Sequence, residues 1–398
     1  HSMTVAVPVR IAMVAGEASG DLLASQLMQA LQARLPGAVF FGVGGPRMLG
    51  MGFQSWHPLE KLSVRGYAEV LRHYRGIAAI RRDLQRRLLA DRPDVFIGVD
   101  APDFNLVLER KLKRRGVRSI HYVSPSIWAW RGARIHKIGT AVSRVLTLFP
   151  FETALYEQQG IPVSYVGHPL ADMLPLEDGR DVARTLLGLP SQKPVFALLP
   201  GSRQAELQYM ADTFIQTARR IHAQLPDALF LAPLATRETR VLFDEALHRC
   251  QAKQLPIRLL FGHAHQAMMA ADAVLVASGT ATLEAALLKR PMAIAYKMAP
   301  LSYRIMRRMG YLPYVGLPNV LAGKFVVPEF IQDEATPENL AQALLNLYAD
   351  KTACQRISAL FREMHLQLRQ NAAEQAAAAI VGELPAVERV HAAFPAAV

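Results

Sequence analysis

The chain has 398 residues, of which 51% are hydrophobic and 20% charged, and it carries a formal net charge of +12. This length is too great for one small core, so we expect two domains of a globular protein and exclude a disordered or fibrous chain. The two cysteines, Cys250 and Cys354, cannot build a disulfide framework and fit a reducing, cytoplasmic setting, and no run of 18 apolar residues predicts a membrane-spanning helix.

The positive charge calls for an anionic partner. Nucleic acid, an anionic membrane surface and a phosphorylated substrate would all suit it. The sequence contains no zinc-finger spacing and no RNP-type aromatic motif. This makes nucleic acid the least favoured of the three partners without excluding it, so we expect no nucleic acid and keep the other two partners.

The first half of the chain alternates between strand and helix patterns. The predicted strands are residues 10–15, 38–43, 94–100, 119–123, 143–149 and 163–166, and the predicted helices are residues 22–35, 61–90 and 102–113. The first strand and helix enclose a glycine-bearing turn, whose candidate cleft residues are Gly16, Glu17, Ser19, Gly20 and Asp21. This unit is typical of a doubly wound α/β domain. The turn lacks GxGxxG and the chain lacks GxxxxGK[ST], which disfavours a dinucleotide or P-loop site.

Residues 61–90 form an unusually basic amphipathic segment. Eight Lys and Arg residues, among them Arg72 and Arg75, stand against two acids. An apolar stripe at helical spacing consists of Tyr67, Val70, Leu71, Tyr74, Ile77 and Ala78. Such a helix can lie in a membrane interface, with its long basic side chains reaching lipid phosphates. It can equally bury the stripe and leave a solvated basic face, and both interpretations stay open.

Asp100 is the strongest candidate for acid–base chemistry. It ends the predicted strand 94–100, and ligands of open α/β sheets bind at the carboxyl ends of strands. Asp103, in the first turn of the following helix, has an ordinary explanation as a partner of the helix dipole. Asp100 has none. Ser124 follows the next strand and is a second candidate at the same edge.

The strand–helix pattern starts afresh after residues 167–169. The predicted strands are now residues 195–199, 228–232, 257–261, 273–277 and 291–296, and the predicted helices are residues 206–224, 281–288, 337–348 and 352–379. Two successive series predict two Rossmann-like α/β domains with a cleft between them. We place the first at residues 4–168, completed by the C-terminal helices of residues 352–390, and the second at residues 169–351.

The stretch 274–284 (VLVASGTATLE) joins a strand end, a turn of small residues and a helix start. The free N–H groups of such a helix can bind phosphate around Gly279, with hydroxyl donors from Ser278 and Thr280. Glu284 lies one turn further on the same helical face, where a carboxylate can accept hydrogen bonds from ribose. This is the layout of a nucleotide site, although an ordinary helix cap explains the stretch equally well.

Arg203 is the best single charge of the second half. It follows a strand and a Pro-Gly turn, where a fixed guanidinium can grip a diphosphate in bidentate fashion. An exposed loop arginine is the alternative, but the turn at 278–280 is expected at the same sheet edge and favours function. The chain has no DxD clamp, and His263 with His265 is weak evidence for a metal, so we expect no metal and no cofactor.

Seven motifs along the chain resemble those of one family. They are VAGEASGD (14–21), GGPRM (44–48), DAPDFN (100–105), HYVSPSIWAWR (121–131), LLPGSR (198–203), ASGTATLE (277–284) and LPNVLAG (317–323). Together they are highly specific, and they run along almost the whole chain without a departure at the motif positions. The chain resembles the lipid-A-disaccharide synthase family of bacterial glycosyltransferases, which have the GT-B fold.

The resemblance implies a reaction and a setting. UDP-2,3-diacylglucosamine donates its sugar to 2,3-diacylglucosamine 1-phosphate (lipid X), which gives a β-1,6-linked disaccharide 1-phosphate and UDP with inversion and without a metal. The enzyme is expected to be peripheral on the cytoplasmic face of the inner membrane and to form a homodimer. Two acylated, phosphorylated substrates would also account for the positive charge and for the basic helix.

The resemblance also assigns roles. Asp100 is the expected general base, with Glu17 and Asp21 in reserve, while Arg203 and the 278–280 turn receive the diphosphate. Glu284 is expected to bind the ribose, and Asn319 of the LPN motif to contact the donor sugar or its phosphate.

Two other functions remain alternatives. A nucleotide-sugar hydrolase or epimerase would release UDP without lipid X. A non-enzymatic basic surface protein would bind polyanions in a salt-sensitive way and show no UDP affinity.

Overall fold

The computed structural model describes residues 7–62, 67–125, 133–277, 279–301, 303–304 and 316–385, with the backbone alone at 67–73 and 133. The chain divides into two compact units, one made of residues 1–172 and 368–398 and the other of residues 173–367. The first change of unit lies close to the expected boundary at 168. The return to the first unit comes at Leu368, later than the expected residue 352.

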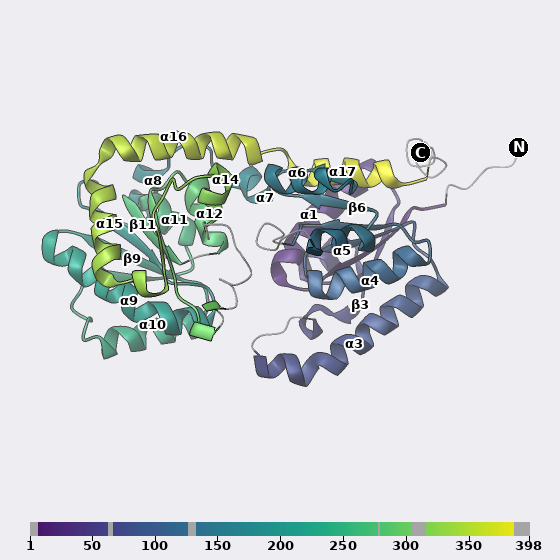
Figure 1. Cartoon of the computed structure of the whole chain (residues 1–398), viewed down its shortest axis with the longest axis horizontal. Helices are drawn as coiled ribbons and strands as arrows, with labels where there is room; N and C mark the ends of the chain where they lie inside the picture. Colours follow the sequence, from purple (N-terminus) through teal and green to yellow (C-terminus); the bar gives the residue numbers. More distant parts are fainter. Residues whose placement is uncertain are drawn as a thin grey trace, which may run out of the picture. The chain divides into compact units, whose positions relative to one another are not determined.

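A parallel sheet forms the centre of the first unit (Figure 1). Its described strands are β1 (Arg10–Ala15), β2 (Val39–Gly44), β3 (Gln54–Pro58), β4 (Val95–Val99), β5 (Ser119–Tyr122), β6 (Arg144–Thr147) and β7 (Val163–Tyr165). They lie in the order β3-β2-β1-β4-β5-β6-β7, and all neighbours are parallel. Every residue of β4 is buried, as expected for a strand covered on both faces.

Helices and one 3₁₀ turn connect these strands. They are α1 (Ala18–Arg34), α2 (Pro46–Gly50), η1 (Leu59–Lys61), α3 (Tyr67–Ala90), α4 (Pro102–Arg114), α5 (Ala133–Ala141), α6 (Pro150–Gln158), α7 (Pro169–Met173) and α17 (Ala372–Glu383). The helices α3, α4 and α5 pack side by side, whereas α17 packs against α1 (Figure 1). The core between α3, α4 and the sheet includes Ile80, Leu84, Leu108 and Phe96.

The second unit repeats the plan with a six-stranded sheet in its described residues. Its strands are β8 (Val195–Leu199), β9 (Leu229–Leu234), β10 (Ile257–Phe261), β11 (Ala273–Ala277), β12 (Met292–Tyr296) and β13 (Glu329–Ile331). They lie in the order β10-β9-β8-β11-β12-β13 and pair in parallel throughout. The short strands β3 and β13 escaped the sequence prediction. Both lie at sheet edges without a buried apolar run, and such a run is the signal that marks a covered strand.

The helices of the second unit are α8 (Arg180–Leu186), α9 (Gln204–Gln224), α10 (Arg237–Arg249), α11 (Ala264–Ala270), α12 (Thr280–Leu287), α14 (Leu317–Ala322), η3 (Gln332–Glu334), α15 (Pro337–Ala349) and α16 (Lys351–Leu368). The segment 352–379, which was expected to be strongly helical, divides between two helices, α16 and α17. Asn371 takes a left-handed φ of 60°, and Asp172 accepts hydrogen bonds from the amides of Asn371 and Ala372 at 2.9 and 2.8 Å. This cap starts a new helix.

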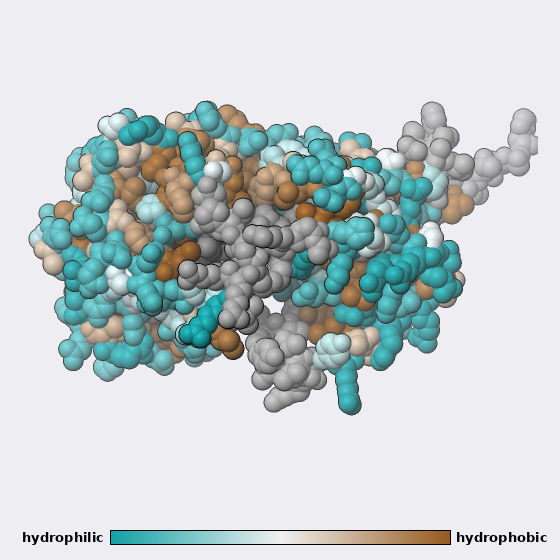
Figure 2. Space-filling model, viewed as in Figure 1, coloured by the Kyte–Doolittle hydropathy of each residue, from teal (hydrophilic) through white to brown (hydrophobic). Residues whose placement is uncertain are grey.

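Among the described residues, no helix combines the length and the apolar character needed to cross a bilayer. On the face drawn in Figure 2, hydrophilic residues cover most of the described surface, and hydrophobic residues appear in patches between them.

Candidate active site

The first sheet reverses its strand order between β1 and β4. From β1 the chain proceeds to β2 and β3 on one side, while β4 is followed by β5, β6 and β7 on the other. Gly16 and Glu17 follow β1, and Asp100 follows β4, so these residues lie at the carboxyl ends of adjacent strands. The two turns approach closely, since a Cβ on Gly16 would lie 3.1 Å from that of Ala101. Such a switch point is where open α/β sheets bind ligands.

The backbone at Asp100 is held in an unusual conformation. Asp100 and Ala101 have positive φ angles of 52° and 43°, which non-glycine residues rarely adopt. The Asp100 amide donates to the carbonyl of Tyr122 at 2.8 Å, and the Asn105 side chain donates to the Asp100 carbonyl at 2.9 Å. These bonds hold the sharp turn of the backbone at the end of β4, from which the Asp100 carboxylate projects.

The Asp100 carboxyl is half-buried, and its environment favours proton uptake. Burial raises its pKa above the ordinary value, the nearby His121 opposes this shift, and Glu17 raises the pKa further. A carboxylate with a raised pKa is a better proton acceptor than a fully solvated one.

The other residues of the first turn divide into two kinds. Glu17 and Ser19 are exposed at the switch point, whereas Gly20 is buried against β1 and β4. Asp21 is 3% exposed, and its carboxylate accepts hydrogen bonds from the amides of Gly45, Arg47 and Met48, each at 3.0 Å. Asp21 therefore anchors the start of α2 and is not free to act as the reserve base.

Ser124 is held by buried side chains of α6. Its hydroxyl lies 2.8 Å from the hydroxyl of Tyr156 and donates to the carbonyl of Pro125 at 2.9 Å. Burial raises the pKa of the neighbouring Glu152 to about 8, although a hydrogen bond with Ser124 opposes the shift. Burial therefore favours the protonated form of Glu152. The sequence did not identify Glu152 as a neighbour of Ser124, because the two residues lie 28 positions apart.

The second sheet has its own switch point between β8 and β11. These strands are paired in parallel, with β9 and β10 on one side and β12 and β13 on the other. Arg203 follows β8, and Gly279 and Thr280 follow β11, so the two turns predicted to bind diphosphate emerge beside each other. All three residues are exposed. Ser278 lies outside the described residues.

Glycines shape both turns of this switch point. Gly201 has a φ of 134°, and a Cβ there would lie 2.5 Å from the Cβ of Glu206. Gly279 has a φ of 129° and is the N-cap of α12, where it has no side chain to occupy the first amides. An anion can therefore approach the start of α12 closely.

Glu284 contacts His265, a histidine that the sequence offered only as weak evidence for a metal site. His265 on α11 places Nε2 2.8 Å from Oε2 of Glu284, which is 20% exposed. The hydrogen bond with Glu284 raises the pKa of His265 against the opposing effect of burial. The pair orients the carboxylate one helical turn from the anion-binding turn and leaves Oε1 of Glu284 for another partner.

Asn319 is an internal anchor in the structure, and its expected contact with the donor stays a prediction. Its side chain is fully buried and makes four hydrogen bonds. The amide nitrogen donates to the carbonyl of Val327 at 2.9 Å and to the carboxylate of Glu329 at 2.7 Å. The amide oxygen accepts from Val326 at 2.7 Å and Val327 at 3.0 Å. The two donors and the oxygen of the side-chain amide are thus all engaged within the chain.

The basic helix α3 is partly explained by packing. Leu84 and Leu88 are buried in the core, and Arg87 stacks over Trp56 at 3.8 Å from the ring centroid. Tyr74, by contrast, is 66% exposed, and Arg75 is exposed beside it. The side chains of the remaining predicted membrane residues lie outside the described residues: Tyr67, Val70, Leu71 and Arg72.

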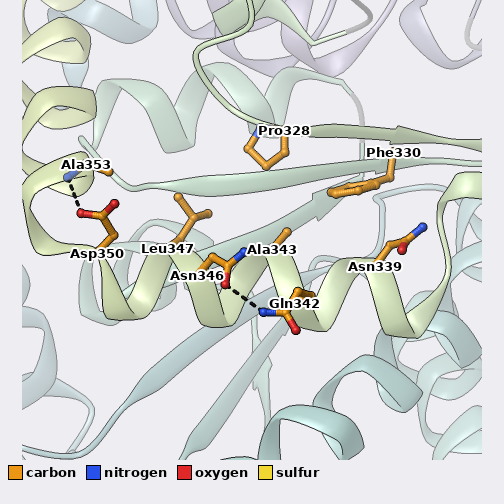
Figure 3. A pocket seen from close by; sticks show the side chains of 9 residues that line it. All are labelled: Pro328, Phe330, Asn339, Gln342, Ala343, Asn346, Leu347, Asp350 and Ala353. Atoms are coloured by element: carbon orange, nitrogen blue, oxygen red, sulfur yellow. Dashed lines mark hydrogen bonds between the residues drawn. The ribbon is translucent and has the colours of Figure 1, made fainter.

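Two further features of the described residues lie outside the two switch points or are absent from them. Within the described ranges, no three His, Cys, Asp or Glu side chains gather in a way that could hold a metal ion. A groove of about 450 Å³ lies between α15 and β13, over an apolar floor of Phe330 and Leu347 (Figure 3). Its rim is formed by amide side chains such as Asn339 and Asn346, and none of the predicted site residues lines it.

Comparison with known proteins connects the whole chain to one family. A family model described as lipid-A-disaccharide synthetase matches residues 11–381, which include every candidate site residue. The lipid-A-disaccharide synthase of Dechloromonas aromatica is 64% identical over 374 residues, covering 94% of this chain and 98% of the relative. That of Aromatoleum aromaticum is 59% identical over 372 residues, with 94% and 95% covered.

Solved structures share the fold at low sequence identity. The UDP-GlcNAc 2-epimerase of Neisseria meningitidis, bound to UDP-GlcNAc, matches with a TM-score of 0.61 at 11% identity and covers 94% of this chain and 99% of its own. MurG of Acinetobacter baumannii matches with a TM-score of 0.58 at 16% identity and the same coverage. These likenesses confirm the predicted GT-B fold. They do not choose between an epimerase and a transferase.

Proposed function

Because the chain belongs to the lipid-A-disaccharide synthase family, it is a glycosyltransferase, and we propose that Asp100 and the second switch point divide its chemistry between them. The reaction transfers a diacylglucosaminyl group from UDP-2,3-diacylglucosamine to the 6-hydroxyl of 2,3-diacylglucosamine 1-phosphate, and UDP leaves. Family membership also decides against the epimerase and the non-enzymatic surface protein considered from the sequence.

Asp100 is the proposed proton acceptor. An alcohol is far too weak an acid for a carboxylate to ionise it beforehand, so the proton moves to Asp100 as the bond from the acceptor O6 to C1 of the donor forms. The bond from C1 to the phosphate oxygen breaks in the same step, and its electron pair leaves with UDP. The fixed backbone at Asp100, its half-burial and its raised pKa support this role. Of the two reserve candidates, Asp21 is engaged with α2, while Glu17 is exposed.

The donor nucleotide is assigned to the switch point of β8 and β11. Arg203 and the first amides of α12, around Gly279 and Thr280, would neutralise the diphosphate as it departs. Glu284, oriented by His265, would accept hydrogen bonds from the ribose hydroxyls. The single observation that carries this assignment is the pairing of β8 with β11, which brings two turns from distant parts of the chain to one sheet edge. Ser278 keeps its proposed role as a hydroxyl donor.

Two acylated substrates imply work at a lipid surface. We assign membrane contact to the exposed part of α3 around Tyr74 and Arg75 and propose a peripheral enzyme on the cytoplasmic face of the inner membrane, acting as a homodimer. Replacement of both residues by Ala should weaken co-sedimentation with phosphatidylglycerol vesicles while UDP affinity stays normal. Tyr209 is an exposed tyrosine of the second unit, and Tyr209→Ala is the matched control. Equal vesicle binding by both variants would remove α3 from the membrane surface.

The decisive test of the mechanism is the variant Asp100→Asn. It should lower kcat by at least ~100-fold in an assay with both lipid substrates and mass analysis of the disaccharide, because the proton acceptor is lost. UDP binding, measured by calorimetry, should be unchanged. Asp103→Asn is the matched control, since Asp103 lies three residues away on the exposed first turn of α4. Near-normal turnover of Asp100→Asn would eliminate Asp100 as the base.

A further inference from the structure

A buried acid–base pair lies beneath Asp100. Nδ1 of His121, on β5, lies 2.8 Å from Oε1 of Glu109, on α4, and both side chains are completely buried. Within the described part of the chain, neither the second ring nitrogen of His121 nor the second carboxylate oxygen of Glu109 has a hydrogen-bond partner. The strand beside the pair is adapted to it, because a Cβ on Gly98 would lie 1.9 Å from Oε1 of Glu109.

The pair is a poor means of stabilising the fold. Burying two ionisable groups costs several kcal/mol per charge, and apolar side chains of similar volume often serve stability equally well or better. The surrounding core of Phe96, Leu108 and Leu112 shows that the space between α4 and the sheet is otherwise apolar. The polar pair therefore calls for a purpose beyond packing.

His121 lies on the strand next to β4, close to the strand end that carries Asp100. His121 is the register partner of Gly98, and paired residues of adjacent strands point to the same face. Asp100 follows Gly98 by two positions, and the ladder continues beyond the strand as the Asp100 amide bonds to Tyr122. Asn105, on α4 as Glu109 is, ties the Asp100 carbonyl to this same helix.

We propose that His121, oriented by Glu109, is a positioning residue that keeps the Asp100 carboxylate ionised and ready to accept the proton of the acceptor hydroxyl. The inference rests on the proposed role of Asp100. Glu109 favours the protonated form of the His121 imidazole, and the charge of that imidazole favours the ionised form of Asp100. Without it, a half-buried carboxylate beside Glu17 would take up a proton from solvent more readily.

The charges around the three groups agree with this role. The charge of His121 lowers the pKa of Asp100, whereas burial and Glu17, from the turn after β1, raise it. Glu109 raises the pKa of His121 against the opposing effect of burial, and Asp100 and the backbone of Val123 raise it further. Of the other charged groups nearby, Asp21 of α1 is engaged with the amides at the start of α2, and Arg81 of α3 lies over the ring of Phe104.

The test is the dependence of kcat/KM on pH, measured with both lipid substrates for His121→Gln and Glu109→Gln. The acid limb of this profile reports the pKa of the base in the free enzyme. Loss of His121 removes the opposing charge, and loss of Glu109 lets His121 give up its proton. Both variants should therefore shift the acid limb to higher pH by about one unit. On the acid side kcat/KM then falls about tenfold, and at high pH the difference disappears.

Controls separate this role from simple packing. Ser119→Ala removes a buried hydroxyl of β5 that donates to the backbone carbonyl of Glu109 at 3.2 Å. It disturbs the packing between α4 and β5 without changing charge, so its acid limb should stay in place. If a variant folds too poorly for kinetics, the Asp100 carboxyl is titrated by ¹³C NMR in the isosteric Glu109→Gln protein. The Asp100 resonance is identified as the one that is absent from the spectrum of Asp100→Asn.

The outcomes distinguish this inference from the proposed function. An unmoved acid limb or an unmoved Asp100 titration in the variants, with Asp100→Asn inactive, overturns the role of His121 and leaves the base in place. Normal turnover of Asp100→Asn overturns the base itself. An upward shift in both variants, together with an inactive Asp100→Asn, supports both.

Discussion

Asn319 offers a sharp test of whether a residue in a family motif acts on the ligand or on the fold. Asn319→Ala would remove four hydrogen bonds and leave the amides of Val326 and Val327 without their acceptor. The carbonyl of Val327 loses its side-chain donor as well, while Glu329 keeps its bond to the Gly316 amide at 3.0 Å. At roughly 1 kcal/mol or more for each buried group left unpaired, we expect a loss of about 3 kcal/mol in the free energy of unfolding.

The assay is urea unfolding combined with amide hydrogen exchange of Val326 and Val327, which should exchange much faster in the variant. UDP affinity, measured by calorimetry on the folded protein, should change little because the Asn319 side-chain amide is fully engaged within the chain. Asn339→Ala is the control, since the Asn339 side chain makes its one bond at an exposed position of α15. Unchanged unfolding together with a large loss of UDP affinity would refute the anchor role and restore the direct contact with the donor.

Three further predictions address the remaining site residues. Arg203→Ala should weaken UDP binding about tenfold in calorimetry, and Arg203→Lys should recover only part of this because an ammonium lacks the bidentate fork; unchanged affinity would place the diphosphate elsewhere. Glu284 raises the pKa of His265 in the folded protein. The stabilisation from their contact is therefore fully present below the pKa of His265 in the unfolded chain, and it is lost as the pH rises through the pKa in the folded protein. Glu284→Gln should accordingly lower the His265 midpoint in an NMR titration, and an equal midpoint would contradict the contact. Asp21→Ala should cost about 2 kcal/mol in urea unfolding by orphaning amides at the start of α2, with normal UDP affinity in the folded protein.

The sequence predicted the turns that follow the carboxyl ends of the strands, because these turns depend on local residue types. The strands β1, β8, β10 and β11 have the predicted bounds, since each is a short run of mostly apolar residues closed by small or turn-forming residues. Parallel βα repetition places the carboxyl ends of the strands at one edge of each sheet, so turns from distant segments were expected to share that edge. The sequence alone therefore predicts that Arg203 and the start of α12 lie at the same edge of the second sheet.

Only the tertiary structure decided which polar residues of these turns remain available to a ligand. Asp21 and Asn319 belong to motifs as specific as that of Asp100, yet both are consumed by internal hydrogen bonds. The pairs of His265 with Glu284 and of His121 with Glu109 join different elements, and no local pattern announces them. The physical reason is that a carboxylate or amide binds whichever partner the packing of elements brings within about 3 Å. The sequence by itself determined where polar groups would gather, and the packed chain determined which of them are already satisfied.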